Sequence, residues 1–191
     1  KFLQETFGTG NRTTINTTYD ATTTYCYEDG TVGINSLECP DQSGTELNDG
    51  KYTIGKEAQS IASWAPAYWY TGGDHTGDIN GRMAIFNASY SPGIFYTATI
   101  TGAIPNIPIQ YSFWVINLDR SDAPGIATRL RPNVRVEFRD SSNNIIASVN
   151  TGDIPRTSAS NPTGDRYNFT ANLNLNVSTF YVVFINNNTG G

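Results

Sequence analysis

Residues 72–81 carry the side chains with the clearest potential for chemistry. Oxygen-bearing side chains stand there at alternate positions, directly before a glycine: Asp74, Thr76, Asp78 and Asn80. Successive oxygens at this spacing suit a hard cation, so the segment predicts a Ca²⁺ site. A twelve-residue calcium loop would end in Glu, whereas Ile85 occupies that position. The alternative is a network of Asx turns that caps a strand expected at 83–87.

A group of aromatic residues precedes this segment: Trp64, Tyr68, Trp69 and Tyr70. Sugar rings stack on exposed aromatic faces, because their axial C–H bonds meet the electron-rich ring. Asp, Asn and Arg side chains nearby would then hydrogen-bond the sugar hydroxyls. The group therefore predicts a ligand-binding surface for glycans. The alternative is that the segment folds back and buries at least two of these rings.

Residues that could perform catalysis are sparse. His75 is the one histidine of the chain, and no Gly-x-Ser-x-Gly motif accompanies it. Carboxylates are present, but a glycan-active hydrolase or lyase would need two of them facing each other in a cleft. We expect no catalytic residues and no enzyme activity, and we expect His75 to be a hydrogen-bonded structural residue.

Net charge and the length of apolar runs argue against two kinds of partner, nucleic acid and membrane. The 191 residues have a net charge of -5, and only Arg129, Arg131, Arg135 and Arg139 form a basic group. Nucleic-acid binding normally needs a basic face, so no nucleic acid is expected as a partner. Apolar runs stay far below the roughly 20 residues of a membrane helix, so no membrane insertion is expected.

Cys26 and Cys39 are the two cysteines of the chain. They form no Cys-x-x-Cys pair and, with a single histidine, cannot complete a zinc site. A disulfide between them would contribute about 3 kcal/mol, and two free thiols are the alternative. Together with few Lys and many Thr and Asn residues, the cysteines favour an oxidising, extracytoplasmic location. We expect a secreted protein whose export signal is not part of this sequence.

Short runs of β-branched and aromatic residues, bounded by Gly, Pro, Asn or Asp, recur along the chain. Such runs are typical of β-strands. Strands are expected at 83–87, 93–101, 110–118, 133–139, 144–149, 166–171 and 178–186, with less regular ones at 2–7, 22–27 and 50–54. This spacing predicts an all-β fold, an antiparallel β-sandwich or jelly roll. Long loops are expected at 28–50, 55–81 and 119–132, largely in the N-terminal half.

Several segments match one recurrent bacterial module in order: 2–10, 49–54, 74–77, 80–83, 87–89, 92–96, 131–134 and 151–155. The chain resembles a galactose-binding-type, carbohydrate-binding-module-like jelly roll found near the start of large type IX-secreted bacterial surface proteins, many of them adhesin-like. The resemblance covers nearly the whole chain. It implies one non-catalytic jelly-roll domain over residues 1–191, located at the cell surface.

The resemblance also implies a feature of the C-terminal end. Modules of this type continue into a strand with a Leu-Asp-Asp-Ile-like motif, whose paired Asp residues help to bind a structural Ca²⁺. An acidic residue near the first strand, here Glu5, assists them. This sequence reaches Gly191 before such a strand, so we expect a domain that lacks its last strand. The open sheet edge would be completed by a strand-donating partner chain.

The expected function is that of a non-catalytic extracellular adhesion module, with structural calcium as cofactor. Its partner would be a glycan or a surface protein. The alternative is a structural module of a surface filament or complex, without a small ligand. Exposure of the aromatic group and the state of the sheet edge distinguish the two hypotheses.

Overall fold

The computed structural model describes residues 4–15, 17–31, 44–158 and 167–188. These residues form twelve strands, one short α-helix, α1 (Ala65–Tyr68), and three 3-10 helices, η1 (Thr17–Tyr19), η2 (Gln59–Ile61) and η3 (Ile126–Thr128). The prediction of an all-β antiparallel sandwich is confirmed, while jelly-roll connectivity stays a prediction. None of the helices in the described ranges has the length and apolar character that crossing a membrane requires.

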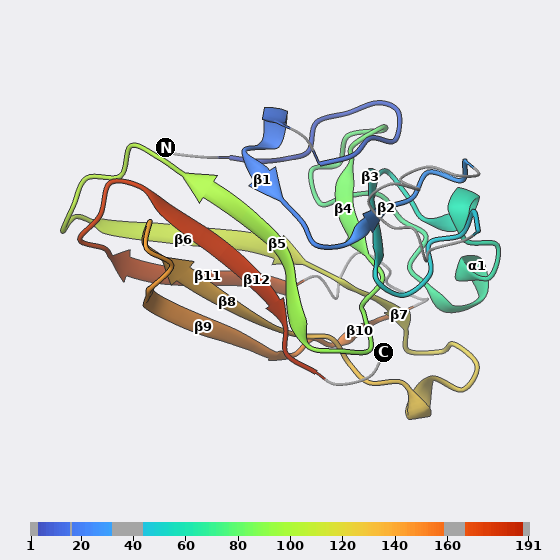
Figure 1. Ribbon diagram of the computed structural model, residues 1–191. Helices are drawn as coiled ribbons and strands as arrows, with labels where there is room; N and C mark the ends of the chain where they lie inside the picture. Colours follow the sequence, from blue (N-terminus) through green and yellow to red (C-terminus); the bar gives the residue numbers. More distant parts are fainter. Residues whose placement is uncertain (1–3, 16, 32–43, 159–166, 189–191) are drawn as a thin grey trace.

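The larger layer is a five-stranded antiparallel sheet (Figure 1). Its strands, in spatial order, are β1 (Ala21–Thr22), β5 (Gly93–Ile100), β12 (Phe180–Asn186), β8 (Asn133–Arg139) and β9 (Ile145–Asp153). In β8 the apolar residues alternate with charged ones, so Val134, Val136 and Phe138 are buried, as the alternation predicts. Glu137 is also buried, because Arg135 and Arg139 form ion pairs with it.

The second layer is an antiparallel pair, β6 (Pro108–Val115) and β11 (Tyr167–Asn174). Ile109 from β6 and Leu173 from β11 pack in one hydrophobic cluster with residues of the larger sheet, among them Phe138, Phe180 and Val182. This cluster forms the core of the sandwich. Burial of these side chains away from water supplies the main stabilising free energy of the two layers.

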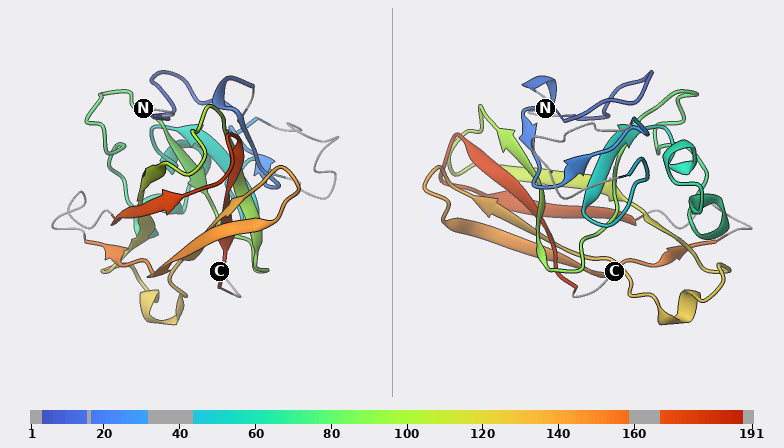
Figure 2. Two further views of the ribbon diagram at one scale, coloured as in Figure 1. Left: turned by 90° about the vertical axis from the view of Figure 1, so that its left-hand side faces the viewer. Right: turned by 45° about the vertical axis from the view of Figure 1, so that its right-hand side comes forward.

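A smaller sheet stands at one end of the sandwich, as the right view of Figure 2 shows. It contains β2 (Cys26–Tyr27), β3 (Lys51–Gly55) and β4 (Met83–Phe86), and β2 runs parallel to β3. Tyr19, Tyr52 and Ile54 form the core of this part. Residues around α1 and η2 pack in a third cluster with Leu47 and Ile85. The Tyr19–Tyr52–Ile54 core and this third cluster both flank the cavity described below.

Two expected strands are divided by side-chain hydrogen bonds to the backbone. The run 110–118 breaks at Ile116, after which β7 (Asn117–Arg120) pairs in parallel with β10 (Arg156–Thr157) in a separate sheet. The buried Asn117 amide donates to the Ile154 carbonyl at 3.1 Å and accepts from the Asp119 N–H at 3.0 Å. These bonds replace ladder contacts and end the first strand.

The run 22–27 divides in the same way into β1 and β2. The Thr23 hydroxyl donates to the Phe95 carbonyl, and the Thr24 hydroxyl donates to the Ile94 carbonyl. Of the expected strand 2–7, residues 4–7 lie in no strand, and residues 2–3 are outside the described ranges. The remaining expected strands are present, with boundaries that differ by a few residues.

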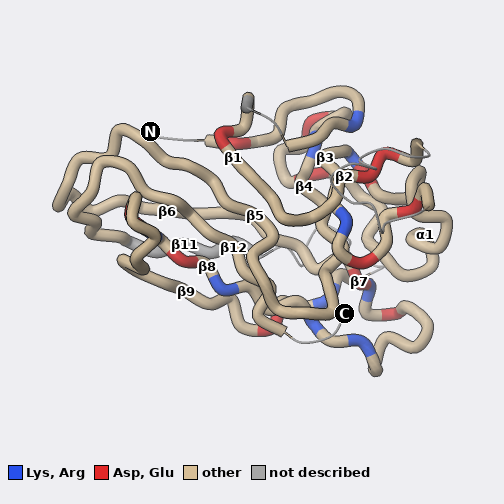
Figure 3. The backbone as a smooth tube through the Cα atoms, in the orientation of Figure 1, with Lys and Arg blue, Asp and Glu red and all other residues tan. Residues whose placement is uncertain are grey.

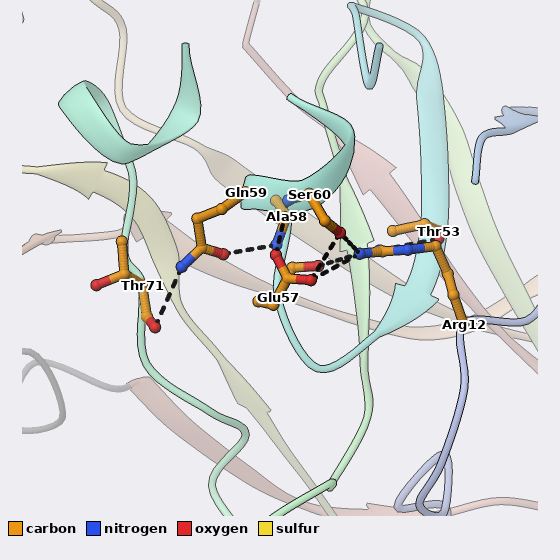
Figure 4. A network of polar contacts seen from close by, with 7 residues as sticks. All are labelled: Arg12, Thr53, Glu57, Ala58, Gln59, Ser60 and Thr71. Carbon is orange, nitrogen blue, oxygen red and sulfur yellow. Dashed lines mark hydrogen bonds and ion pairs between the residues drawn. The ribbon is translucent and has the colours of Figure 1, made fainter. Parts of the chain in front are cut away.

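Arg12 fixes the N-terminal segment against β3 and η2 (Figure 4). Its guanidinium donates to the Glu57 carbonyl at 2.8 Å, the Glu57 carboxylate at 3.1 Å and the Ser60 hydroxyl at 2.9 Å. A Cβ at Gly55 would lie 2.7 Å from Nη1 of Arg12, so a side chain at position 55 would displace the guanidinium. The network holds the segment that leads into α1.

Charged residues are unevenly distributed over the molecule (Figure 3). They gather around β2, β3 and β7 and along the segment that joins β7 to β8, whereas the opposite ends of the long strands are nearly free of charge. Charged side chains are therefore concentrated where the smaller sheet meets the sandwich.

Candidate functional site

A cavity of about 590 Å³ lies between the sandwich and the smaller sheet. Its apolar wall includes Trp64, Trp69, Phe86 and Phe95, and its polar wall includes Asn48, Asp49, Asn87, Asn117, Asp119, Arg129 and Asn186. Tyr90 and Leu130 also line it and are 66% and 49% exposed, so the cavity communicates with solvent. Its volume and its mixed wall are those of a small-molecule site.

The short helix α1 brings two tryptophans together on the cavity wall. Trp64 and Trp69 flank the helix, and the Trp69 N–H donates to the Ala65 carbonyl at 2.7 Å. Their ring centroids lie 4.6 Å apart with the planes at 76°, an edge-to-face contact. Trp69 is buried, whereas Trp64 is half-buried, and both line the cavity.

The other two residues of the predicted aromatic surface are placed differently. Tyr68 lies beneath Arg129, whose Cζ is 4.5 Å from the ring centroid. Tyr70 is buried, and its hydroxyl donates to the Gly73 carbonyl at 2.8 Å. Neither is among the residues that line the cavity. The segment folds back and buries Trp69 and Tyr70, as the alternative predicted, while Trp64 and Trp69 lie on one wall of the cavity.

An ion pair between Asp119 and Arg129 occupies the polar side of the cavity. Nη1 of Arg129 lies 3.0 Å from Oδ1 of Asp119. The Asp119 side chain is 12% exposed and that of Arg129 is 34% exposed, so the pair is partly shielded from water. Stacking on Tyr68 adds a cation–π contact to the same guanidinium. Both charged groups are therefore held in place before any ligand arrives.

Amide side chains are hydrogen-bonded to the backbone around the cavity. Nδ2 of Asn87 donates to the Leu47 carbonyl at 3.0 Å, and Nδ2 of Asn186 donates to the Ser89 carbonyl at 3.2 Å. Each of these bonds uses one of the two N–H groups of the amide, which leaves a second donor on each side chain. The bonds fix the orientation of the amides, so that their remaining polar atoms are preorganised.

Two tyrosines lie at the same cavity. The hydroxyl of Tyr25 accepts from the Ser89 N–H at 2.8 Å, and burial raises the pKa of Tyr25. A hydrogen bond with the Asp49 carboxylate raises the pKa of Tyr90. Both hydroxyls thus add polar groups to the cavity wall, and each has a hydrogen-bond partner within the protein.

The predicted calcium segment forms a turn network. The Thr76 hydroxyl lies 2.9 and 2.8 Å from the two carboxylate oxygens of the buried Asp74, and the Asp78 N–H donates to the Thr76 oxygen at 3.2 Å. Asp78 and Asn80 are exposed. The carboxylate of Glu5 accepts from the Phe7 N–H. No cluster of three or more acidic, histidine or cysteine side chains suited to a metal occurs within the described ranges, and calcium binding stays a prediction.

His75 and Cys26 are placed outside the cavity. The His75 ring stacks on Trp114, with centroids 5.1 Å apart and planes at 21°. Cys26 lies in β2, while its predicted partner Cys39 lies outside the described residues, so the disulfide stays a prediction.

Sequence analysis missed most of the polar residues of the cavity. Arg129 stood out only as part of a basic group, and the structure separates that group: Arg129 pairs with Asp119, whereas Arg135 and Arg139 pair with Glu137. Asn87 was expected as the last residue of the strand 83–87, whereas β4 ends at Phe86 and Asn87 begins the following loop. A polar residue at the end of a strand, where ligand-binding loops often begin, was the signal that could have identified it.

Comparisons with known proteins leave the family open. Profiles of protein families, curated protein sequences and solved structures were compared with the chain, and none of them matched.

Proposed function

We propose that the protein is a non-catalytic extracellular binding module that holds a carbohydrate in the cavity between the sandwich and the smaller sheet. The observation that carries the proposal is the pairing of the Trp64–Trp69 wall with amide side chains across one solvent-accessible cavity. This combination suits a sugar, which presents an apolar C–H face and a rim of hydroxyls. In the parent protein the module would attach a bacterial surface to glycans or to a glycosylated surface protein.

Both carboxylates of the cavity are engaged within the protein, which supports a binding role over a hydrolytic one. Asp119 is paired with Arg129, and Asp49 is hydrogen-bonded with Tyr90. A glycosidase needs two carboxyl groups that face the scissile bond of the sugar from either side. The predicted calcium at Asp74, Thr76, Asp78 and Asn80, or with Glu5, would be structural and separate from the cavity.

A structural assembly module is the second candidate function, supported by the edge strand β9. This strand has β8 on one side and ends the order of its sheet in the described part of the chain. From Ile145 to Gly152 it carries no charged residue, and Ile145 is 52% exposed. Uncharged edge strands accept strands of other chains. Concentration-dependent oligomerisation of the protein alone would favour this candidate.

Tryptophan fluorescence tests the carbohydrate proposal directly. Two of the three tryptophans line the cavity, and Trp114 is the third. Trp114→Phe removes the background signal and serves as the matched control, because Trp114 does not line the cavity. Glycans that bind on an array would then be titrated while the emission of Trp64 and Trp69 is recorded.

We expect Trp64→Ala to weaken binding by at least about 10-fold, equivalent to about 1.4 kcal/mol, with Trp114→Phe unchanged. Equal affinity of the Trp64→Ala variant and the wild type would contradict binding at the cavity. Absence of binding to any glycan on the array would contradict the carbohydrate proposal itself.

A further inference from the structure

We propose that the cavity selects uncharged sugars and excludes acidic ones, whose carboxylate or sulfate would face the Asp119–Arg129 side. The inference rests on the proposed function and names the ligand class of the same site.

Charge at the cavity disfavours anions. Among the lining residues that the structure describes, the acidic and basic side chains are Asp49, Asp119 and Arg129. Two carboxylates and one guanidinium leave a formal excess of one negative charge. An anionic ligand would therefore enter a site of its own sign, whereas a neutral ligand meets no such repulsion.

Arg129, the one cation among these lining residues, is already engaged. Its Nη1 lies 3.0 Å from Oδ1 of Asp119, and its Cζ lies over the Tyr68 ring, 4.5 Å from the ring centroid. A ligand carboxylate that bound the remaining N–H groups of Arg129 would share the guanidinium with Asp119 and lie close to the Asp119 carboxylate. Repulsion between the two carboxylates would oppose binding.

The groups that remain for recognition suit hydroxyls. The amides of Asn48 and Asn87 each carry donors and an acceptor, and Oδ1 of Asn87 accepts no hydrogen bond from the described residues. A sugar hydroxyl likewise donates one hydrogen bond and accepts others. A neutral hexose can satisfy both kinds of atom without an uncompensated charge, and the Trp64 surface can contact its C–H face.

The Asp119–Arg129 ion pair also predicts how a substitution changes the preference for neutral over acidic sugars. Asp119→Asn removes the counter-charge of Arg129 but keeps the shape of the side chain and the backbone N–H that donates to Asn117. Arg129 would then be the cation available to a ligand carboxylate. Asp122→Asn is the matched control, because Asp122 also pairs with an arginine, Arg120, yet lies outside the cavity lining.

The test uses an array that carries neutral glycans beside the same glycans with a uronic acid, sialic acid or sulfate at the end. We expect the wild type and Asp122→Asn to bind the neutral members at least about 10-fold more tightly than their acidic counterparts. In Asp119→Asn the preference should fall below about 3-fold or reverse. If the Asp119→Asn variant fails to fold, the comparison of neutral with acidic glycans on the wild type still tests the selectivity.

Two outcomes would overturn the inference, and they differ in what else they affect. Equal or tighter binding of acidic glycans by the wild type would reject the selectivity and leave the carbohydrate-binding function standing. Binding of neither series would reject both. Retention of the full neutral preference by a folded Asp119→Asn variant would reject the role assigned to the Asp119–Arg129 pair.

Discussion

Lys51 and Glu28 form an ion pair that is almost entirely removed from solvent. Nζ of Lys51 lies 2.7 Å from Oε2 of Glu28, and the two side chains are 4% and 1% exposed. Lys51 also donates to the Glu46 carbonyl at 3.1 Å, and Oε1 of Glu28 accepts from the Gly30 N–H at 2.7 Å. The pair thus joins β3 to the residues that follow β2, beside the candidate cavity.

Removal of one partner of this pair should be far more damaging than removal of both. Glu28→Ala leaves the Lys51 charge buried without a counter-charge, and we expect a loss of about 3–5 kcal/mol in the free energy of unfolding. The double variant Glu28→Leu, Lys51→Met should recover most of that loss. Urea unfolding measures the free energy of unfolding of the single and the double variant. As a control, Asp122→Ala breaks a more exposed pair and should cost far less stability than Glu28→Ala. A loss below 1 kcal/mol in Glu28→Ala would contradict the prediction.

The Arg12–Glu57 network should make stability depend on pH in the acid range. Partial burial alone would raise the pKa of Glu57, but hydrogen bonds from Ser60 and the charge of Arg12 outweigh it and lower that pKa below its ordinary 4.5. Folding therefore favours the ionised carboxylate. Its stabilising contribution is complete above the unfolded-state pKa and disappears as the pH falls through the lower folded-state value.

Glu57→Gln tests this linkage. The variant should be less stable than the wild type at pH 7, and the difference should shrink as the pH falls below about 4.5, where the unfolded-state carboxyl becomes protonated. Urea midpoints measured from pH 7 to pH 3 would show the convergence. A difference that stays constant over this range would mean that Glu57 contributes through packing and not through its charge.

Gly81 is expected to tolerate no side chain, because the Asp74 carboxylate occupies the adjacent space. A Cβ at position 81 would lie 2.5 Å from Oδ1 of Asp74, whereas a Cβ at Gly73 would meet nothing within 4 Å. We expect Gly81→Ala to cost about 1–3 kcal/mol and Gly73→Ala to change stability by less than about 0.5 kcal/mol. Thermal unfolding compares the two. Equal melting temperatures would show that the Asp74 side chain moves aside freely.

The calcium prediction has its own test, thermal unfolding with Ca²⁺ and with EDTA. Because the Thr76 hydroxyl bonds to both Asp74 oxygens, an ion there has to displace this hydrogen bond. If the segment binds the ion, Ca²⁺ at 100 times its dissociation constant adds about 2.7 kcal/mol and raises the melting temperature by several degrees. Asp78→Ala should abolish that rise. Identical curves with Ca²⁺ and EDTA would leave the segment as a turn network only.

Strands were predictable wherever the residue pattern is local. The alternation of Val134, Val136 and Phe138 identified both β8 and its buried face. The break at Ile116 was not predictable, because it depends on a hydrogen bond from Asn117 to the distant Ile154. Two-residue strands such as β1 and β2 are defined by long-range pairing and leave no periodic pattern.

The candidate site was predictable only in part, for a similar reason. Trp64 and Trp69 are close in sequence and stood out by their residue type. Their counterparts Asn87, Asp119 and Arg129 lie between 18 and 60 residues beyond Trp69, and only the tertiary fold brings them to one cavity. Their residue types are common on protein surfaces, so composition alone does not single them out.

The position of β12 determines when the larger sheet can form during synthesis. This strand is the last one that the structure describes, yet it lies between β5 and β8 and pairs with both. A nascent chain that has not yet reached Phe180 lacks the strand that joins the two halves of the sheet. Until then β5 and β8 lack the strand that lies between them, and one edge of each stays unpaired. Completion of the sheet therefore has to wait until nearly all of the described chain has been synthesised.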